Sequence, residues 1–306
     1  MPRALVGIGS RKVPMETFSI TVPKPIEKQS IVVRDITLRS EMREVEVLQK
    51  EVWQSDDRDV VPLNIFAATQ EVGAILLGAF DGPTLVGFAY SFVGRENERL
   101  VQHSHMLAVK PSHRNLNLGY QFKLAQRERA LAQGIGRMTW TFDPLQSLNG
   151  HFNFAKLGVI ADAYHINFYG EETSSPLLQI GSDTDRLWVT WLLDSRRVVE
   201  RLKERGSSRV STFELGSISP VVRVGPNNTP EARAWSKELE QTYLTIEIPS
   251  DINSLQVEIP QLALKWREET RRAFSEAISA GYIVEDFYSS SRNDYAVGVY
   301  LLSRQE

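Results

Sequence analysis

The stretch "VKPSHRNLNLGYQFK", residues 109–123, runs from the end of an apolar strand through a basic, asparagine-rich turn into a helix. A helix begins with four backbone N–H groups that lack partners inside the helix, and its dipole adds roughly half a positive charge at the same end. Phosphate and pyrophosphate groups bind at such ends. We therefore interpret residues 115–120 as a candidate anion site, with a solvated surface turn as the alternative.

The charge near this turn differs from the charge of the whole chain. His113, Arg114, Lys123 and Arg127 add positive charge locally, whereas the complete chain has a net charge of −3. That balance favours no bulk attraction to nucleic acid or to an anionic membrane. The predicted partners therefore include no nucleic acid and no membrane, and any anion must be bound locally.

Three absences narrow the classes of protein further. The chain has no cysteine, which excludes disulfides, a cysteine nucleophile and thiolate metal sites. No apolar run approaches the roughly 20 residues that a membrane span needs. Residues 1–25 also lack the apolar core of a secretory signal. We expect a cytoplasmic protein.

Hydrophobic periodicity divides the 306 residues into blocks. Residues 1–30 are interpreted as an N-terminal arm, 31–205 as a first block, 206–235 as a Gly-, Ser- and Pro-rich linker, and 236–306 as a smaller lobe. The expected order is β-α-β-β-β-α-β-α-β-β and then β-α-β-β, which predicts an α/β (α+β) fold with a mixed, mostly antiparallel sheet flanked by helices. The strands of the first block are expected at 31–37, 73–80, 84–94, 100–110, 137–143, 161–170 and 185–194. Its helices are expected at 38–53, directly after the opening turn up to about residue 133, and at 147–158.

The opening stretch matches neither of two common phosphate-binding motifs. The Gly-Lys-Ser/Thr of a Walker loop and the G-x-G-x-x-G of a dinucleotide fingerprint are both absent. The pattern V-x-P-x-x-R-x-x-N-x-G, however, resembles the acyl-CoA-binding motif of the GNAT superfamily of N-acyltransferases, Gln/Arg-x-x-Gly-x-Gly/Ala after a V-x-P-x-x strand end. Arg114 takes its first position, Asn117 the first glycine position and Gly119 the second. Asn is the residue other than glycine that best tolerates positive φ.

The resemblance covers roughly residues 30–303. "NGHFNFAKLG" (149–158) resembles the family's helix beside the acyl thioester. "GAFDGPTLVGFAYSF", "HSHMLAVKP", "TDRLWVTW" and the later "IEIP" resemble a subgroup of predicted bacterial GNAT-type acyltransferases with an extra C-terminal lobe. The resemblance implies a GNAT-like fold and acyl-CoA, acetyl- or succinyl-like, as co-substrate without a metal. It also implies a small-molecule amine, such as an amino acid, as acceptor.

For the site, the resemblance implies that the strands at 100–110 and 137–143 splay apart to admit pantetheine. The backbone of residues 106–109 then contacts pantetheine and the acyl carbonyl. Asn149 and Asn153 lie on one helix face and are candidates to bind donor or substrate, with capping and solvation as the respective alternatives. The predicted cofactor-binding residues are Leu107, Ala108, Val109, Arg114, Asn115, Leu116, Asn117, Leu118, Gly119, Tyr120, Asn149, Asn153, Phe154 and Lys156.

Acyl transfer to an amine benefits from a general base, and imidazoles titrate near neutral pH. His103 and His105 are two apart on one strand, so we expect them to share a face with Leu107 and Val109. His105 is the predicted base or substrate contact. His103 is expected to be a core histidine or a substrate contact. A His-x-His metal site is the third alternative, and no third ligand follows at a recognisable spacing.

Asp143 is the second candidate base and a candidate contact for the substrate ammonium, with capping of the turn "DPLQ" as an equal alternative. Many GNAT enzymes place a tyrosine, acid to the leaving thiolate, where this chain has Phe154; Tyr164 or Tyr169 would have to substitute. The sequence therefore predicts N-acyl transfer by direct attack, in a monomer or homodimer. The alternatives are a non-catalytic acyl-CoA-binding or regulatory module and, less favoured, a metal hydrolase.

Overall fold

The structure is a computed structural model that describes residues 31–54, 56–170, 184–203, 218–233 and 241–304. The predicted N-terminal arm lies outside these residues. The strands are β1 (Val32–Asp35), β2 (Ile75–Asp81), β3 (Thr84–Glu96), β4 (Arg99–Val109), β5 (Arg137–Phe142), β6 (Ile160–His165), β7 (Arg186–Leu192), β8 (Pro220–Val224), β9 (Pro230–Ala232), β10 (Tyr243–Pro249), β11 (Tyr282–Arg292) and β12 (Tyr295–Arg304). The principal helices are α1 (Arg39–Trp53), α2 (Leu63–Gln70), α3 (Leu118–Ala132), α4 (Ser147–Gly150), the π-helix η3 (His151–Leu157), α6 (Arg196–Lys203), α8 (Ile252–Glu258) and α9 (Pro260–Ser279).

The described strands form one sheet in the order β1-β2-β3-β4-β5-β7-β6-β11-β12-β10-β8-β9. Within it only β4 with β5 and β8 with β10 pair in parallel; the remaining neighbours are antiparallel. The sequence prediction of a mixed, mostly antiparallel sheet with flanking helices is therefore confirmed. No helix in the described ranges is long and apolar enough to span a membrane.

Helices cover the two faces of the first block differently. One face carries α1 and α2 over a cluster that includes Met42, Phe66 and Phe88, and the other carries α3, whose Phe122 belongs to the larger core. The helical spacing of Met42, Val45, Leu48 and Val52 explains why α1 buries one side. Leu38, the first residue of the predicted helix at 38–53, instead precedes the helix and is 59% exposed.

The helix α2 was not expected from the sequence. Its eight residues, "LNIFAATQ", bury only Phe66, so the segment has too little apolar repetition to produce a helical pattern. Its position on the α1 side comes from tertiary packing, including an edge-to-face contact between Phe66 and Tyr90 with ring centroids 4.9 Å apart.

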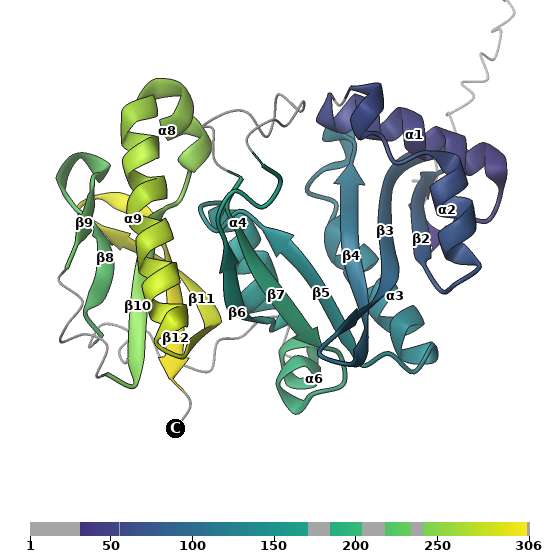
Figure 1. Cartoon of the computed structure of the whole chain (residues 1–306). Coiled ribbons are helices and arrows are strands. Elements are labelled where there is room, and N and C mark those ends of the chain that lie inside the picture. The colour runs from purple at the N-terminus through teal and green to yellow at the C-terminus, as the bar shows by residue number, and fades with distance from the viewer. Residues whose placement is uncertain (1–30, 55, 171–183, 204–217, 234–240, 305–306) are drawn as a thin grey trace, which may run out of the picture. The chain divides into compact units, whose positions relative to one another are not determined.

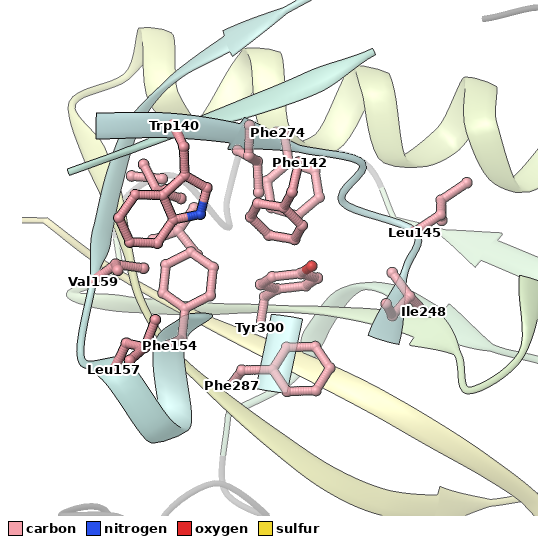
Figure 2. Close-up of a cluster of buried hydrophobic side chains, with 14 of the residues drawn as sticks. Trp140, Phe142, Leu145, Phe154, Leu157, Val159, Ile248, Phe274, Phe287 and Tyr300 are labelled. Atoms are coloured by element: carbon pink, nitrogen blue, oxygen red, sulfur yellow. The ribbon is translucent and has the colours of Figure 1, made fainter. Parts of the chain in front are cut away.

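The C-terminal elements extend the same sheet. Strands β6 and β11 join the two parts through the pairing of Ala161 with Val284. Aromatic side chains from both parts pack together behind this junction (Figure 2). The ring of Tyr300 lies 5.8 Å from Phe154, 5.2 Å from Phe274 and 4.7 Å from Phe287, each in an edge-to-face arrangement.

The predicted β-α-β-β order after residue 236 appears as β10, α8 with α9, β11 and β12. Strands β8 and β9 lie within the segment interpreted as a linker, and β8 pairs with β10. The part of that segment at 204–217 lies outside the described residues. The domain boundaries at 205, 235 and 30 stay predictions.

Candidate functional site

The two central strands, β4 and β5, stop pairing with each other halfway along their length. β4 and β5 pair in parallel at only two positions, Gln102 with Met138 and His103 with Thr139. Beyond these residues the strands diverge, as their arrows in Figure 1 show. We call this point the fork: it opens at Ser104 on β4 and Trp140 on β5. On its β5 side, β4 then has no partner strand in the described part of the chain, so its backbone groups there are free to bind a ligand.

A bulge interrupts β4 at the fork. Tyr90 of β3 pairs with Met106 and Ser91 pairs with Ser104, so His105 is an extra residue without a partner on β3. Such bulges redirect side chains and are common beside active sites.

The bulge overturns one expectation from the sequence. His103 packs against Phe92 on the α1 side, whereas Leu107 and Val109 join the core on the α3 side. The histidines therefore do not share a face with these two residues, because one inserted residue reverses the alternation of the strand. His103 and His105 do remain neighbours, with ring centroids 6.2 Å apart.

The turn after β4 presents unpaired backbone donors. A short 3₁₀ turn (Pro111–His113) leads from the strand, and helix α3 begins at Leu118. The first helical hydrogen bond from this end is donated by Gln121 N–H to the carbonyl of Asn117. Within the described residues, the six N–H groups of residues 115–120 have no acceptor in the protein. This is the donor array that an anion needs.

Two asparagines shape that array. Asn115 has a φ of 65° and Asn117 a φ of 60° with ψ of 20°, both in the left-handed region. The structure thus places Asn117, at the first glycine position of the resembled motif, in the conformation that Asn tolerates best. Asn115 adopts the same conformation, which the sequence reading did not anticipate. The space around Gly119 is open, because a Cβ added there would meet nothing nearer than Leu107 Cδ2 at 4.0 Å.

The positive charge at the turn is smaller than the sequence suggested. His113 lies 3.5 Å from Asp81, and the Arg127 side chain donates to the carbonyl of Leu193 at 2.7 Å. Lys123 points into the protein and is 4% exposed. Of the four basic residues, Arg114 alone stays exposed without a partner in the described ranges. An anion at this turn would therefore be held mainly by backbone N–H groups.

The α3 side of the fork holds a buried polar cluster. Lys123 Nζ donates to Ser104 Oγ at 2.9 Å, and the Ser104 hydroxyl donates to Gln126 Oε1 at 3.0 Å. The Nζ atom also lies 3.5 Å from the ring centroid of Trp140. Burial lowers the pKa of Lys123 well below its ordinary value. The sequence indicated none of this, because nothing local distinguishes a lysine that points inward from one on the surface.

The opposite side of the fork is aromatic. His103 stacks on Trp188 with ring centroids 4.9 Å apart, and its Nδ1 lies 3.1 Å from Thr139 Oγ1. The ring centroid of His105 lies 5.8 Å from that of Phe92. Burial lowers the pKa of His105, and burial followed by His105 and Lys123 lowers the pKa of His103 to about 4. Both imidazoles are therefore neutral near pH 7, the form that accepts a proton.

We expect His103 to titrate with a midpoint near pH 4 in the folded protein. Its pKa lies below the unfolded value of about 6.5, so the unfolded chain binds more protons between these values and His103 contributes stability that is lost as pH falls from 6.5 to 4. A histidine NMR titration, assigned with His103→Gln, measures the midpoint. A midpoint near 6.5 would contradict the burial argument.

Asp143 is not free at the fork. Its carboxylate forms a bidentate ion pair with Arg267 of α9, at 2.6 and 2.8 Å, and accepts the N–H of Leu145 at 3.0 Å. The turn-capping alternative is thus present in the structure. The guanidinium, which nothing in the sequence pattern linked to Asp143, competes with any substrate ammonium for the carboxylate.

The helix after β5 places its candidates apart. Asn149 is exposed, and Lys156 is partly buried. Asn153, whose alternative was a solvated side chain, is instead buried and accepts the indole N–H of Trp140 at 3.2 Å. Phe154 is fully buried beside Tyr300 (Figure 2), so this position offers no proton donor. Residues 151–157 form a π-helix that ends at Gly158, with a φ of 75°.

The two tyrosines that could replace that donor differ in availability. Tyr164 donates to Asp185 Oδ2 at 2.7 Å, and burial together with Asp185 raises its pKa. It therefore holds its proton tightly. Tyr169 lies at the surface, 3.5 Å from Thr141 Oγ1. Neither contacts the buried cluster at Lys123.

A metal site is not built at the histidine pair. Over the described ranges, no group of three or more His, Cys, Asp or Glu side chains is placed to hold a metal ion. The hydrolase alternative therefore has no ligand set in this part of the chain.

Comparison with known proteins gives likenesses of fold. No family model and no curated protein matches the chain. Solved structures that resemble it include a GNAT family acetyltransferase from Streptococcus pneumoniae (16% identity, TM-score 0.43, covering 53% of this chain and 98% of that one). A GNAT family acetyltransferase from Elizabethkingia anophelis with acetyl-CoA bound has 13% identity and a TM-score of 0.41, and the match covers 53% of this chain and 97% of that one. The aminoglycoside 6'-N-acetyltransferase from Enterococcus faecium has 15% identity and a TM-score of 0.41, and the match covers 54% of this chain and 98% of that one. With TM-scores under 0.5, these likenesses carry no argument about activity.

Proposed function

We propose that this protein is an acyl-CoA-dependent N-acyltransferase. It transfers an acetyl- or succinyl-like group from the coenzyme A thioester to the amine of a small molecule such as an amino acid. The amine attacks the thioester directly, without a covalent enzyme intermediate.

One observation carries this proposal: the donor array at 115–120 stands directly after the strand that opens the fork. Coenzyme A has a pyrophosphate at one position and a reactive sulfur at the end of a long, thin arm. An anion site followed by unpaired strand backbone fits those two parts in order. Within the proposal, residues 115–120 hold the pyrophosphate and β4 beyond the fork lies along the pantetheine arm.

Within the proposal, the acyl carbonyl of the thioester binds beside the bulge of β4. Those backbone N–H groups of residues 106–109 that point away from β3 could polarise the carbonyl oxygen, as donors in an oxyanion hole do. His105 projects from the bulge as a neutral imidazole and is the proposed base. Asp143 is the weaker candidate because Arg267 occupies its carboxylate.

A second candidate function is a non-catalytic acyl-CoA-binding or regulatory module. Phe154 favours it, because the position that would protonate the leaving thiolate carries no acidic hydrogen. The binding surface at 115–120 would be the same in both proposals, so they differ in turnover alone.

Turnover of an acyl-CoA panel separates the two functions. We expect purified protein with acyl-CoAs and a panel of amino acids and other amines to release free thiol, and calorimetry to show saturable CoA binding. Gly119→Glu, with its anion site blocked, supplies the background rate. Saturable binding without release of thiol across the panel would favour the module. If calorimetry detects no CoA binding, both functions are wrong.

A further inference from the structure

Lys123 is a buried lysine without a counter-ion. Its side chain comes from α3 and ends at the fork, where Nζ contacts the first residue of each strand beyond the β4–β5 pairing, Ser104 on β4 and Trp140 on β5. No carboxylate pairs with it in the described part of the chain. Buried ammonium groups are costly when unpaired, so this arrangement requires a reason.

The hydrogen bonds of Lys123 leave one proton without an acceptor. The Ser104 hydroxyl gives its own hydrogen to Gln126, so it can only accept from Lys123. A second hydrogen of the ammonium faces the Trp140 ring. The third has no acceptor among the described residues. Gln126 Nε2 is likewise buried with no acceptor, so the cluster has more donors than acceptors.

A thiolate is an acceptor that the proposed reaction creates at this place. If the pyrophosphate binds at residues 115–120, the pantetheine arm runs from that end of α3 toward the fork. Lys123 lies five residues, or roughly 7.5 Å of helix axis, beyond Leu118. The position that a tyrosine acid would occupy holds Phe154, so the leaving sulfur needs another proton source.

We propose that Lys123 donates the proton that converts the departing coenzyme A thiolate into the free thiol. This role rests on the proposed acyl transfer. The acceptor nitrogen forms a bond to the acyl carbon, and the bond from that carbon to sulfur breaks. The ammonium proton passes to sulfur and leaves a neutral amine. The acceptor nitrogen gives its proton to the proposed base, His105, which releases it to solvent, and Lys123 is protonated again from solvent.

The environment makes the transfer favourable. An ordinary lysine holds its proton more tightly than a thiolate, with a pKa of about 10.4 against about 8.5 for a cysteine thiol. Burial lowers the pKa of Lys123 and so weakens its hold. The groups that contact Nζ are Ser104 from β4 and Trp140 from β5, and Gln126 of the same helix accepts the hydroxyl hydrogen of Ser104. His103 is a nearby titratable group and is neutral above pH 5.

The test compares Lys123→Met and Lys123→Arg with the wild-type protein. Methionine removes the proton, and arginine keeps a charge that it cannot lose. We expect kcat to fall by about 10²–10⁴-fold in both variants while CoA affinity is unchanged. The wild-type kcat should decline as pH rises through the pKa of Lys123 in the complex, because the acid must be protonated. Both variants should lack this alkaline limb.

Stability separates a catalytic from a structural lysine. We expect Lys123→Met to keep or raise the Tm, since a buried unpaired charge is replaced by an apolar chain of similar length. Lys265→Met, at an exposed position of α9, is the control and should change neither kcat nor Tm. A lysine with only a structural role would lower the Tm on removal and leave the pH profile intact.

Three results would overturn the role. One is wild-type kcat in Lys123→Met, and the second is activity retained in Lys123→Arg. The third is an acyl group found on Lys123 by intact mass and peptide mapping, which would make it a nucleophile. If the wild-type protein turns over and these results appear, only the role of Lys123 is wrong. A wild-type protein without turnover refutes both the role and the acyltransferase.

Discussion

Gly119→Glu should abolish binding of coenzyme A and leave the fold intact. The residue is the second of α3, where the N–H groups of residues 115–120 have no acceptor. A carboxylate there would accept from these donors itself and would repel a pyrophosphate. Like charges placed against each other cost several kcal/mol, so we expect at least about 100-fold weaker binding by calorimetry.

The matched control is Gly119→Ala. Its Cβ would lie 4.0 Å from Leu107 Cδ2, an ordinary contact, so alanine fits without strain. We expect it to bind CoA with nearly wild-type affinity. Both variants should remain as stable as the wild type, because a carboxylate in the first turn interacts favourably with the helix dipole. Unchanged affinity in Gly119→Glu would place the pyrophosphate elsewhere on the protein.

Local patterns predicted the frame of this site well. The strand, turn and helix at 109–123 are set by neighbouring residues: Pro111 ends the strand, and Asn117 tolerates a φ of 60° before α3. The short helix ending at Gly158 was predicted for the same reason, since its φ of 75° suits glycine.

Features that depend on distant residues could not be predicted. The bulge at His105 is defined only by its pairing with β3, and the strand alone still alternates. Lys123 of α3 is buried against Ser104 and Trp140, which come from strands β4 and β5. An inward lysine leaves no trace in the helical pattern, because its long aliphatic stem substitutes for an apolar residue.

The pair of Asp143 and Arg267 is the sharpest case, because 124 residues separate its members. The sequence offered Asp143 as base, ammonium contact or turn cap. The structure adds a guanidinium with a side chain 5% exposed, which ties α9 to the end of β5. A buried guanidinium depends on its carboxylate far more than an exposed one does.

Asp143→Asn should therefore destabilise the protein strongly. Asparagine keeps an oxygen for the Leu145 N–H and removes only the charge, which leaves Arg267 buried and unpaired. Breaking one partner of a buried pair costs about 3–5 kcal/mol. Urea denaturation measures the loss. The exposed pair of Arg95 and Glu98, 4.0 Å apart, gives the control: Glu98→Gln should change stability by less than about 0.5 kcal/mol.

The double variant Asp143→Asn with Arg267→Met isolates the cause. It removes the orphaned charge as well, so we expect it to recover most of the stability lost by Asp143→Asn alone. Replacing both members of a buried pair with uncharged side chains is often neutral, whereas breaking the pair is not. If Asp143→Asn instead leaves stability unchanged and lowers kcat, the carboxylate acts on the substrate and Asp143 replaces His105 as the favoured base.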